Sequence, residues 1–208
     1  MPIELWFAFV VASAILLIIP GPTILTVISY SMAHGRRANA PLVAGVALGD
    51  STALVLSVLG LGALLATSAL WFTMVKWIGG SYLLYLGIKL FRAGISSTEL
   101  AAPAAPGSWW RLFANTYLVT ALNPKSIVFF VAFLPQFISP NASVTRQLWV
   151  LAVTFVVLAT INATLYAVFA ASVRKLLSSP RVQRRFNIAG GSLLSVAGLW
   201  ALFSRRPA

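Results

Sequence analysis

The fold of this chain follows from the stretch ILLIIPGPTILTVIS, Ile15 to Ser29, which is apolar enough to lie inside a membrane. Pro20-Gly21-Pro22 stands in the middle of it. Proline cannot donate a backbone hydrogen bond and clashes with the preceding helical turn, so it interrupts a helix. A second apolar run, TYLVTALNPKSIVFFVAFLPQF from Thr116 to Phe137, is interrupted by Asn123-Pro124-Lys125. The sequence therefore predicts two broken helices inside a membrane.

The composition predicts an all-α integral membrane protein. Of the 208 residues, 60% are hydrophobic and only 9% are charged, whereas a soluble domain carries about a quarter charged residues. The chain has no cysteine, one histidine and three acids, which are too few ligands for an ordinary transition-metal site. We therefore expect no metal and no cofactor. The net charge of +12 is interpreted as contact with anionic lipid at basic loops, and no nucleic-acid partner is expected.

Six membrane-spanning segments are predicted, because each needs about 20 mostly apolar residues. They cover residues 3–32, 40–66, 70–91, 112–138, 147–172 and 187–204. The stretch RAGISSTELAAPAAPGSWW is rich in Ala, Pro, Ser and Gly, which is typical of a flexible linker. We therefore expect one transmembrane domain over 1–208, with a first half at 1–92, a cytoplasmic linker at 93–111 and a second half at 112–208.

The lysines and arginines predict the orientation, because cytoplasmic loops carry more of them. Ten lie on the side reached by the loops after the first, third and fifth segments, and four lie on the other side. The ten are Arg36, Arg37, Lys89, Arg92, Arg111, Arg174, Lys175, Arg181, Arg184 and Arg185, and the four are Lys76, Arg146, Arg205 and Arg206. The first side is therefore predicted to be cytoplasmic, with both termini outside. The N-terminus lacks the basic region of a cleavable signal peptide.

The two halves are predicted to be inverted repeats. Each half has three segments, and in each the first segment carries the break. Because three is an odd number, the second half enters the membrane from the opposite side. Broken helices at matching places in inverted halves point to the binding site of a transporter.

The two breaks predict a site for an anion. Gly21 is expected to be the N-cap of one half-helix and Pro22 its first residue, a position that suits proline. Asn123, a preferred N-cap residue, and Pro124 would begin the other half-helix. Each helix start presents free N–H groups and about half a positive charge, which suits a carboxylate.

The preceding half-helices predict the complementary site. They would end at Ile19 and Leu122 and offer backbone carbonyls to a cation, so one locus with both polarities suits a zwitterion. The alternative is that both breaks are ordinary proline kinks, which membrane helices tolerate.

Asp50, in APLVAGVALGDSTALVLSVLG, is the one acid placed within the hydrocarbon region. An aspartate there costs about 2.5–3.5 kcal/mol on insertion scales, so it should face a cavity or a partner. It could accept and release a proton, or stay ionised and hold a substrate ammonium. A structural pair with Lys125 is the alternative.

Other polar and small residues in the predicted segments are assigned to the site, to helix packing or to the substrate pathway. Lys125 could extend toward the interface, but from mid-span a role in the site is favoured. Gly45 and Gly49 permit close helix approach, so packing is the favoured interpretation. Asn162 and Gln136 are candidates for the substrate pathway.

At these residues the sequence resembles the LysE/RhtB family of bacterial amino-acid exporters. The matching pieces are PGPTILTVISYSMAHGRRA, GVALGDS, LGLGALL, KWIGGSYLLYLGIKLFR, ALNPKSIVFFVAFLPQF and NIAGGSLLSVAGL. The family pattern often has Asn or Asp after Pro-Gly-Pro, whereas this chain has Thr23, which would border the pocket. The resemblance implies secondary active amino-acid export across a bacterial inner membrane, driven by the proton gradient. It carries over to Pro20-Gly21-Pro22-Thr23, to Asp50 and to Asn123-Pro124-Lys125. The cost of a buried acid makes Asp50 the expected proton-coupling residue.

Three other functions compete with amino-acid export. An ion or heavy-metal efflux protein would carry more acids or thiols in its spans. An intramembrane enzyme needs a nucleophile and base or a metal set, which the spans lack, so no enzyme is predicted. A non-transporting scaffold has no need for costly buried polar groups. The few charges near the site favour a small neutral substrate such as threonine, homoserine or a branched-chain amino acid. The sequence leaves a homodimer open.

Overall fold

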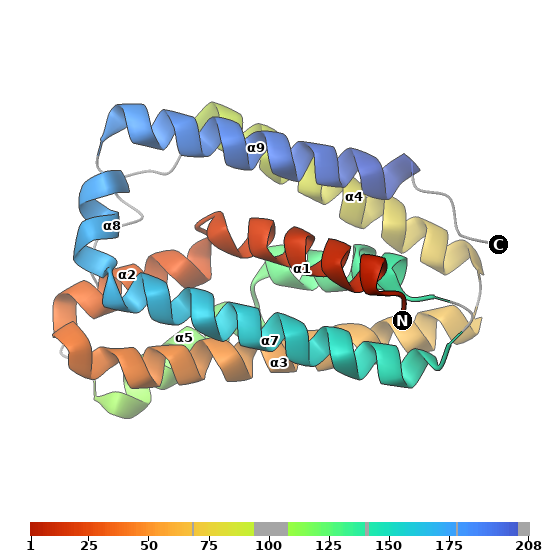
Figure 1. Cartoon of the computed structure of the whole chain (residues 1–208), viewed down its shortest axis with the longest axis horizontal. Helices are drawn as coiled ribbons and strands as arrows, with labels where there is room; N and C mark the ends of the chain where they lie inside the picture. Colours follow the sequence, from red (N-terminus) through yellow and green to blue (C-terminus); the bar gives the residue numbers. More distant parts are fainter. Residues whose placement is uncertain (68, 94–107, 140–141, 178, 204–208) are drawn as a thin grey trace.

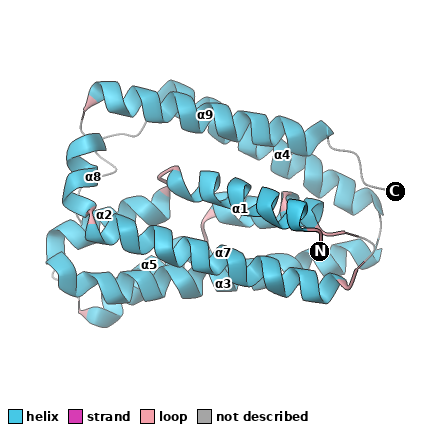
Figure 2. Ribbon diagram, in the orientation of Figure 1, coloured by secondary structure: helices cyan, strands magenta, loops and turns pink. Residues whose placement is uncertain are grey.

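The computed structural model describes residues 1–67, 69–93, 108–139, 142–177 and 179–203, and in these residues all regular structure is helical (Figure 2). The all-α fold predicted from the sequence is therefore confirmed for the described part of the chain. In the first half the elements are α1 (Ile3–Ile18), α2 (Pro22–His34), the short 3-10 helix η1 (Gly35–Ala38), α3 (Asn39–Thr67) and α4 (Ala69–Ala93). In the second half they are α5 (Trp109–Ala121), α6 (Pro124–Ala132), η3 (Leu134–Phe137), α7 (Val144–Val168), α8 (Ala170–Leu177) and α9 (Pro180–Phe203).

Three helix boundaries differ from the boundaries predicted for the segments and the linker. The predicted linker 93–111 overlaps α5, which begins at Trp109 because the Ser108 hydroxyl accepts a hydrogen bond from the Arg111 N–H at 3.4 Å. Residues 94–107 of that linker lie outside the described residues. The fifth segment, 147–172, is interrupted at Phe169, where α7 ends and α8 begins. The sixth begins at Pro180 rather than 187, because proline suits the first position of a helix.

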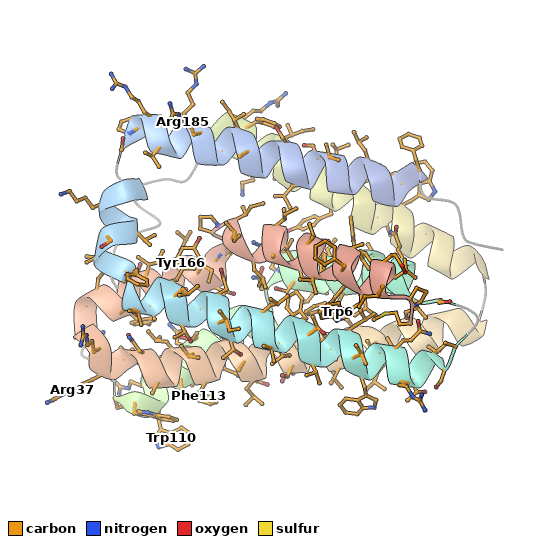
Figure 3. The ribbon with its side chains drawn as sticks, in the orientation of Figure 1. Trp6, Arg37, Trp110, Phe113, Tyr166 and Arg185 are labelled. Atoms are coloured by element: carbon orange, nitrogen blue, oxygen red, sulfur yellow. The ribbon has the colours of Figure 1, made fainter. Side chains whose placement is uncertain are left out.

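The helices form an elongated bundle with two distinct ends (Figure 1). At one end lie the start of α1 and the end of α9, and at the other lie η1 and α8. The second end is rich in basic side chains, as Arg37 and Arg185 show in Figure 3. We call it the basic end, defined by Arg36, Arg37, Arg111, Lys175, Arg181, Arg184 and Arg185, and we call the other the opposite end.

Helices α3 and α5 pack closely because α3 has glycine where they meet. A Cβ atom at Gly45 would lie 2.9 Å from the Phe113 carbonyl oxygen, and one at Gly49 would lie 2.7 Å from Thr120 Cβ. Both distances are too short for a side chain, so the two backbones approach at these glycines. The interpretation of this pair as a packing motif is confirmed.

Helices α4 and α9 lie side by side along one flank of the bundle (Figure 1) and are also joined through glycine. A Cβ at Gly198 would lie 2.7 Å from the Gly80 carbonyl oxygen, and one at Gly191 would lie 2.9 Å from the Gly87 carbonyl oxygen. The two helices carry the same spacing of small residues, GGSYLLYLG at 79–87 and GGSLLSVAG at 190–198. Gly80 near the start of this motif on α4 therefore meets Gly198 at the end of the motif on α9, and Gly191 meets Gly87 in the same way.

Two apolar clusters lie on either side of the helix breaks. Toward the opposite end, six phenylalanines from α1, α6, η3 and α7 and the residues between them pack together. They are Phe9, Phe129, Phe130, Phe133, Phe137 and Phe155. Toward the basic end, a smaller cluster joins α2, α3, α5 and α7 and contains Val27, Tyr30, Leu42, Val46, Leu112 and Ala163. The region of the breaks lies between these two apolar barriers.

The outer face of α7 is as apolar as its buried face. The buried residues are Gln147, Leu151, Phe155, Ala159, Ala163 and Ala167, and the exposed ones include Val153, Val157, Ile161 and Leu165. A helix that is apolar all round fits lipid rather than water. Among the described residues, Pro22–Gly60 and Val144–Val168 are long and apolar enough to cross a membrane, and α1 is a shorter apolar helix.

Candidate functional site

The first break separates α1 from α2. Helix α1 ends at Ile18, and Ile19 leaves the helix with φ −71° and ψ 112°. Gly21 is the N-cap of α2, in extended backbone with φ −122° and ψ −171°, and Pro22 is the first helical residue. No side chain caps this helix start. The first N–H groups of α2 therefore receive no capping side chain from the N-cap residue.

The second break separates α5 from α6. Helix α5 ends at Ala121, and Pro124 begins α6. Asn123 is the N-cap, as expected, and its side-chain oxygen accepts a hydrogen bond from the Lys125 N–H at 3.0 Å. The start of α6 is therefore capped by the protein, in contrast to the start of α2.

The two breaks are bonded to each other. The Asn123 side-chain nitrogen donates to the Thr23 hydroxyl at 3.1 Å. Both side chains are buried. The turn at the second break is thereby joined to the first turn of α2.

Lys125 reaches the end of α1. Its Nζ donates to the Leu16 carbonyl oxygen at 2.8 Å and to the Ile19 carbonyl oxygen at 2.7 Å. The last carbonyls of a helix have no partner within it, and a membrane supplies no water for them. The cation expected at the Ile19 carbonyl is therefore, in this structure, a side chain of the protein.

The two remaining carbonyls of this turn are bonded by side chains of α7. The Asn162 side-chain nitrogen donates to the Leu17 carbonyl oxygen at 3.1 Å, and the Tyr166 hydroxyl donates to the Ile18 carbonyl oxygen at 2.7 Å. Figure 3 labels Tyr166 on α7 beside the end of α1. All four carbonyls from residue 16 to residue 19 are thus occupied by side chains of the second half.

Asp50 lies opposite this cluster on α3. Its side chain is 3% exposed, and its Oδ1 has no hydrogen-bond partner. The carboxyl group has a side-chain hydrogen bond with Ser126 and a charge interaction with Lys125. The Lys125 ammonium is bonded to the backbone carbonyls of Leu16 and Ile19. It therefore acts on the Asp50 carboxyl group from across the cavity rather than through a direct bond. A buried acid oxygen without a partner is costly and is typical of a functional position.

A small cavity lies where these residues meet. Its volume is about 20 Å³, which is room for about one water molecule. It is lined by Leu16, Leu17, Gly21, Thr23, Ile24, Val46, Asp50, Asn123, Lys125, Ser126, Ala159 and Asn162. In this conformation the cavity is too small for an amino acid.

Most of the predicted site residues line this cavity, but four do not. Pro20, Pro22 and Pro124 are absent from the lining, and the last two start the helices that carry it. Gln136 lies in η3, near the end of α6, where its side-chain nitrogen donates to the Ala132 carbonyl at 2.8 Å. The structure therefore gives Gln136 a position away from the cavity.

Ser126 and Tyr166 were missed by the sequence analysis. Ser126 follows Lys125 directly in the first turn of α6. Tyr166 stands four residues after Asn162, and residues at that spacing share one face of a helix. Both could have been found from their spacing to residues already selected. In the described parts of the chain, no group of three or more His, Asp or Glu residues could hold a metal ion.

An apolar helical chain with a polar cavity between two broken helices is typical of membrane transport proteins. The family model of the LysE type translocator matches residues 14–205, so the chain belongs to this family. The resemblance seen in the sequence is thereby confirmed, and the chain is a membrane protein.

Relatives of known name match most of the chain, two of them over 95% of it or more. It is 36% identical over 198 residues to the homoserine/homoserine lactone efflux protein of Salmonella typhi, covering 95% of this chain and 96% of the relative. It is 31% identical over 155 residues to the leucine efflux protein of Salmonella choleraesuis, covering 74% of this chain and 70% of the relative. An uncharacterized membrane protein of Vibrio cholerae is 35% identical over 205 residues, which is 96% of this chain and 97% of the relative. No solved structure matches the chain.

Proposed function

We propose that this protein is a secondary active exporter of small neutral amino acids from the cytoplasm, driven by the proton gradient. The observation that carries the proposal is the cavity at the two breaks, where Asp50 and Lys125 lie with Thr23 and Asn123. These groups offer both charges to a zwitterion. Two relatives with efflux of an amino acid in their names, homoserine in one and leucine in the other, support the same class of cargo.

The two ends of the substrate are assigned to different groups of the site. The carboxylate binds at the helix starts, at Pro22-Thr23 and Asn123-Pro124, where N–H groups and positive dipole ends favour an anion. The ammonium lies toward Asp50 and the carbonyls at the end of α1. Support comes from the uncapped start of α2 and the unpartnered Asp50 oxygen.

A neutral side chain on the substrate fits the walls of the cavity. Its apolar lining comes from Leu16, Leu17, Ile24, Val46 and Ala159. A second charge on the substrate would need a further buried partner, since an unpaired charge is costly away from water. Among the lining residues Asp50 is the only acid. Lysine and arginine are therefore disfavoured as cargo.

Export proceeds by alternating access between two inverted halves, residues 1–92 and 112–208. The repeat is supported by α4 and α9, which carry the same GGS-x5-G spacing. In the two motifs Gly80 corresponds to Gly191, and Gly87 corresponds to Gly198. If the two helices are exchanged, the Gly80–Gly198 contact becomes the Gly191–Gly87 contact, which is what a two-fold axis between them requires. Motion is needed because the cavity has a volume of only about 20 Å³.

The basic end is assigned to the cytoplasm and the opposite end to the outside of the bacterial inner membrane. Lysine and arginine favour the cytoplasmic side, and they gather at the ends of α2, α8 and α9 (Figure 3). Both termini then lie outside. Proton entry from outside competes for Asp50 and weakens its hold on the substrate ammonium.

The first experiment is efflux from cells loaded with a labelled amino-acid mixture, with and without this protein and with a protonophore. Faster loss of a few neutral amino acids, abolished by the protonophore, is the expected result. Unchanged efflux of every amino acid, with the protein shown to be in the membrane, would refute the proposal. Efflux that survives the protonophore would refute only the proton coupling.

A further inference from the structure

The cation at the end of α1 is supplied by the protein. The Lys125 ammonium is bonded at 2.8 Å and 2.7 Å to the carbonyls of Leu16 and Ile19. A primary ammonium on a flexible chain is the same donor group as the α-ammonium of an amino acid, with three N–H bonds and one positive charge. These carbonyls therefore already hold the group that a substrate would present.

The position of Lys125 also leaves little space for a ligand. A Cβ atom at Gly21 would lie 3.4 Å from Lys125 Nζ, so the ammonium fills the space beside the break. The neighbouring cavity measures about 20 Å³. A substrate ammonium can reach these carbonyls only after the Lys125 side chain has moved.

A carboxylate is available on the other side of the cavity. Asp50 is 3% exposed and its Oδ1 has no hydrogen-bond partner. Lys125 already interacts with this carboxyl group across the cavity. A displaced Lys125 would thus find an anion close by, either Asp50 or the carboxylate of the substrate.

We propose that the Leu16 and Ile19 carbonyls form an ammonium subsite, which Lys125 occupies in this structure and releases to the α-ammonium of the substrate. This inference rests on the proposed function and adds to it a residue that determines specificity. The displaced Lys125 then binds the substrate carboxylate.

The exchange makes the carboxylate of the substrate a requirement. A zwitterion adds no net charge to the cavity and supplies an anion for the displaced lysine. A simple amine adds a second cation and supplies no anion, so its binding would leave a charge without compensation. Lys125 therefore selects amino acids over their decarboxylated amines.

The test compares each amino acid with the amine that lacks only its carboxylate. Labelled leucine or homoserine is bound to purified protein and challenged with 3-methylbutylamine or 3-aminopropan-1-ol. The wild type should bind the amino acid and resist the amine. In Lys125→Met the amine should displace the labelled amino acid at a concentration at least about tenfold lower than in the wild type. A factor of that size corresponds to one charge-assisted hydrogen bond. Lys89→Met is the matched control, because Lys89 is exposed on α4 and is absent from the cavity lining.

Two further measurements keep the test decisive if Lys125→Met fails to fold. Lys125→Gln retains a donor for the α1 carbonyls without the charge, and it should shift the preference in the same direction. In the wild type, formate added together with the amine should permit competition, because formate supplies the missing carboxylate.

The outcomes separate the two proposals. If the wild-type protein neither binds nor exports any amino acid, the proposed function is refuted. A wild type that binds leucine or homoserine, with an unchanged preference over the amine in the folded Lys125 variants and no effect of formate, overturns the inference and leaves the function standing.

Discussion

The Asn123 side-chain nitrogen donates a hydrogen bond to the Thr23 hydroxyl at 3.1 Å, although the two residues are 100 positions apart. The oxygen of the same amide accepts from the Lys125 N–H at 3.0 Å. One side chain thus caps α6 and joins it to the first turn of α2. This single amide therefore links the starts of the two half-helices.

Thr23→Val should destabilise the protein through this contact. Valine has nearly the shape of threonine, but it leaves the buried Asn123 N–H group without an acceptor. The cost of such a donor is about 1–3 kcal/mol of unfolding free energy, which thermal denaturation of the purified protein would measure. Thr164→Val is the control, because its hydroxyl is exposed and bonds only the Thr160 carbonyl of its own helix. Equal losses for both variants would contradict a special role for Thr23.

Asp50→Asn should leave folding intact and abolish the coupling of export to the proton gradient. The amide has the same shape and is cheaper to bury than an ionised carboxylate, so the variant should reach the membrane in normal amounts. It cannot take up or release a proton, and we expect protonophore-sensitive efflux to fall to background. Retained proton-driven export in this variant would exclude Asp50 as the coupling residue.

Gly49→Ala should disrupt the contact between α3 and α5. The added Cβ would lie 2.7 Å from Thr120 Cβ and 2.9 Å from the Tyr117 carbonyl oxygen, whereas one at Gly60 of the same helix would meet nothing within 4 Å. Overpacking of this kind costs about 1–3 kcal/mol. Gly60→Ala should be neutral or stabilising. Thermal denaturation of both variants checks the prediction, and a stable Gly49→Ala protein would show that the helices can move apart freely.

The orientation can be tested with single cysteines, because the chain contains none. Arg37 lies at the basic end, and Ser143 precedes α7 at the opposite end. In intact cells a membrane-impermeant thiol reagent should label Ser143→Cys and should label Arg37→Cys only after the membrane is opened. The reverse pattern would place the basic end outside.

The positions of the helix breaks could be predicted from the sequence because their causes are local. Proline removes a backbone donor at Pro22 and Pro124 wherever the chain goes, and an asparagine before proline is a ready N-cap. Asp50 could be selected because an acid within an apolar segment is visible in the sequence itself and is rare unless it has a function. These features need only a few adjacent residues.

The partners of the selected residues could not be predicted, because they depend on tertiary packing. Lys125 bonds carbonyls about 109 positions earlier in the chain, and a backbone carbonyl has no signature in a sequence. The interruption at Phe169 was also missed, since no proline or glycine marks it. The structure has Lys125 bonded directly to the α1 carbonyls, while it interacts with Asp50 only across the cavity.

The last turn of α1 also has a consequence for synthesis of the protein. This helix is made before the residues that bond its carbonyls: Lys125 follows Leu16 by 109 positions, Asn162 follows Leu17 by 145 and Tyr166 follows Ile18 by 148. Until α7 has entered the bilayer, the nascent α1 has bare carbonyls that lipid cannot satisfy. A chain that terminates before α7 is therefore a recognisable unfinished product, and we expect membrane proteases to remove it.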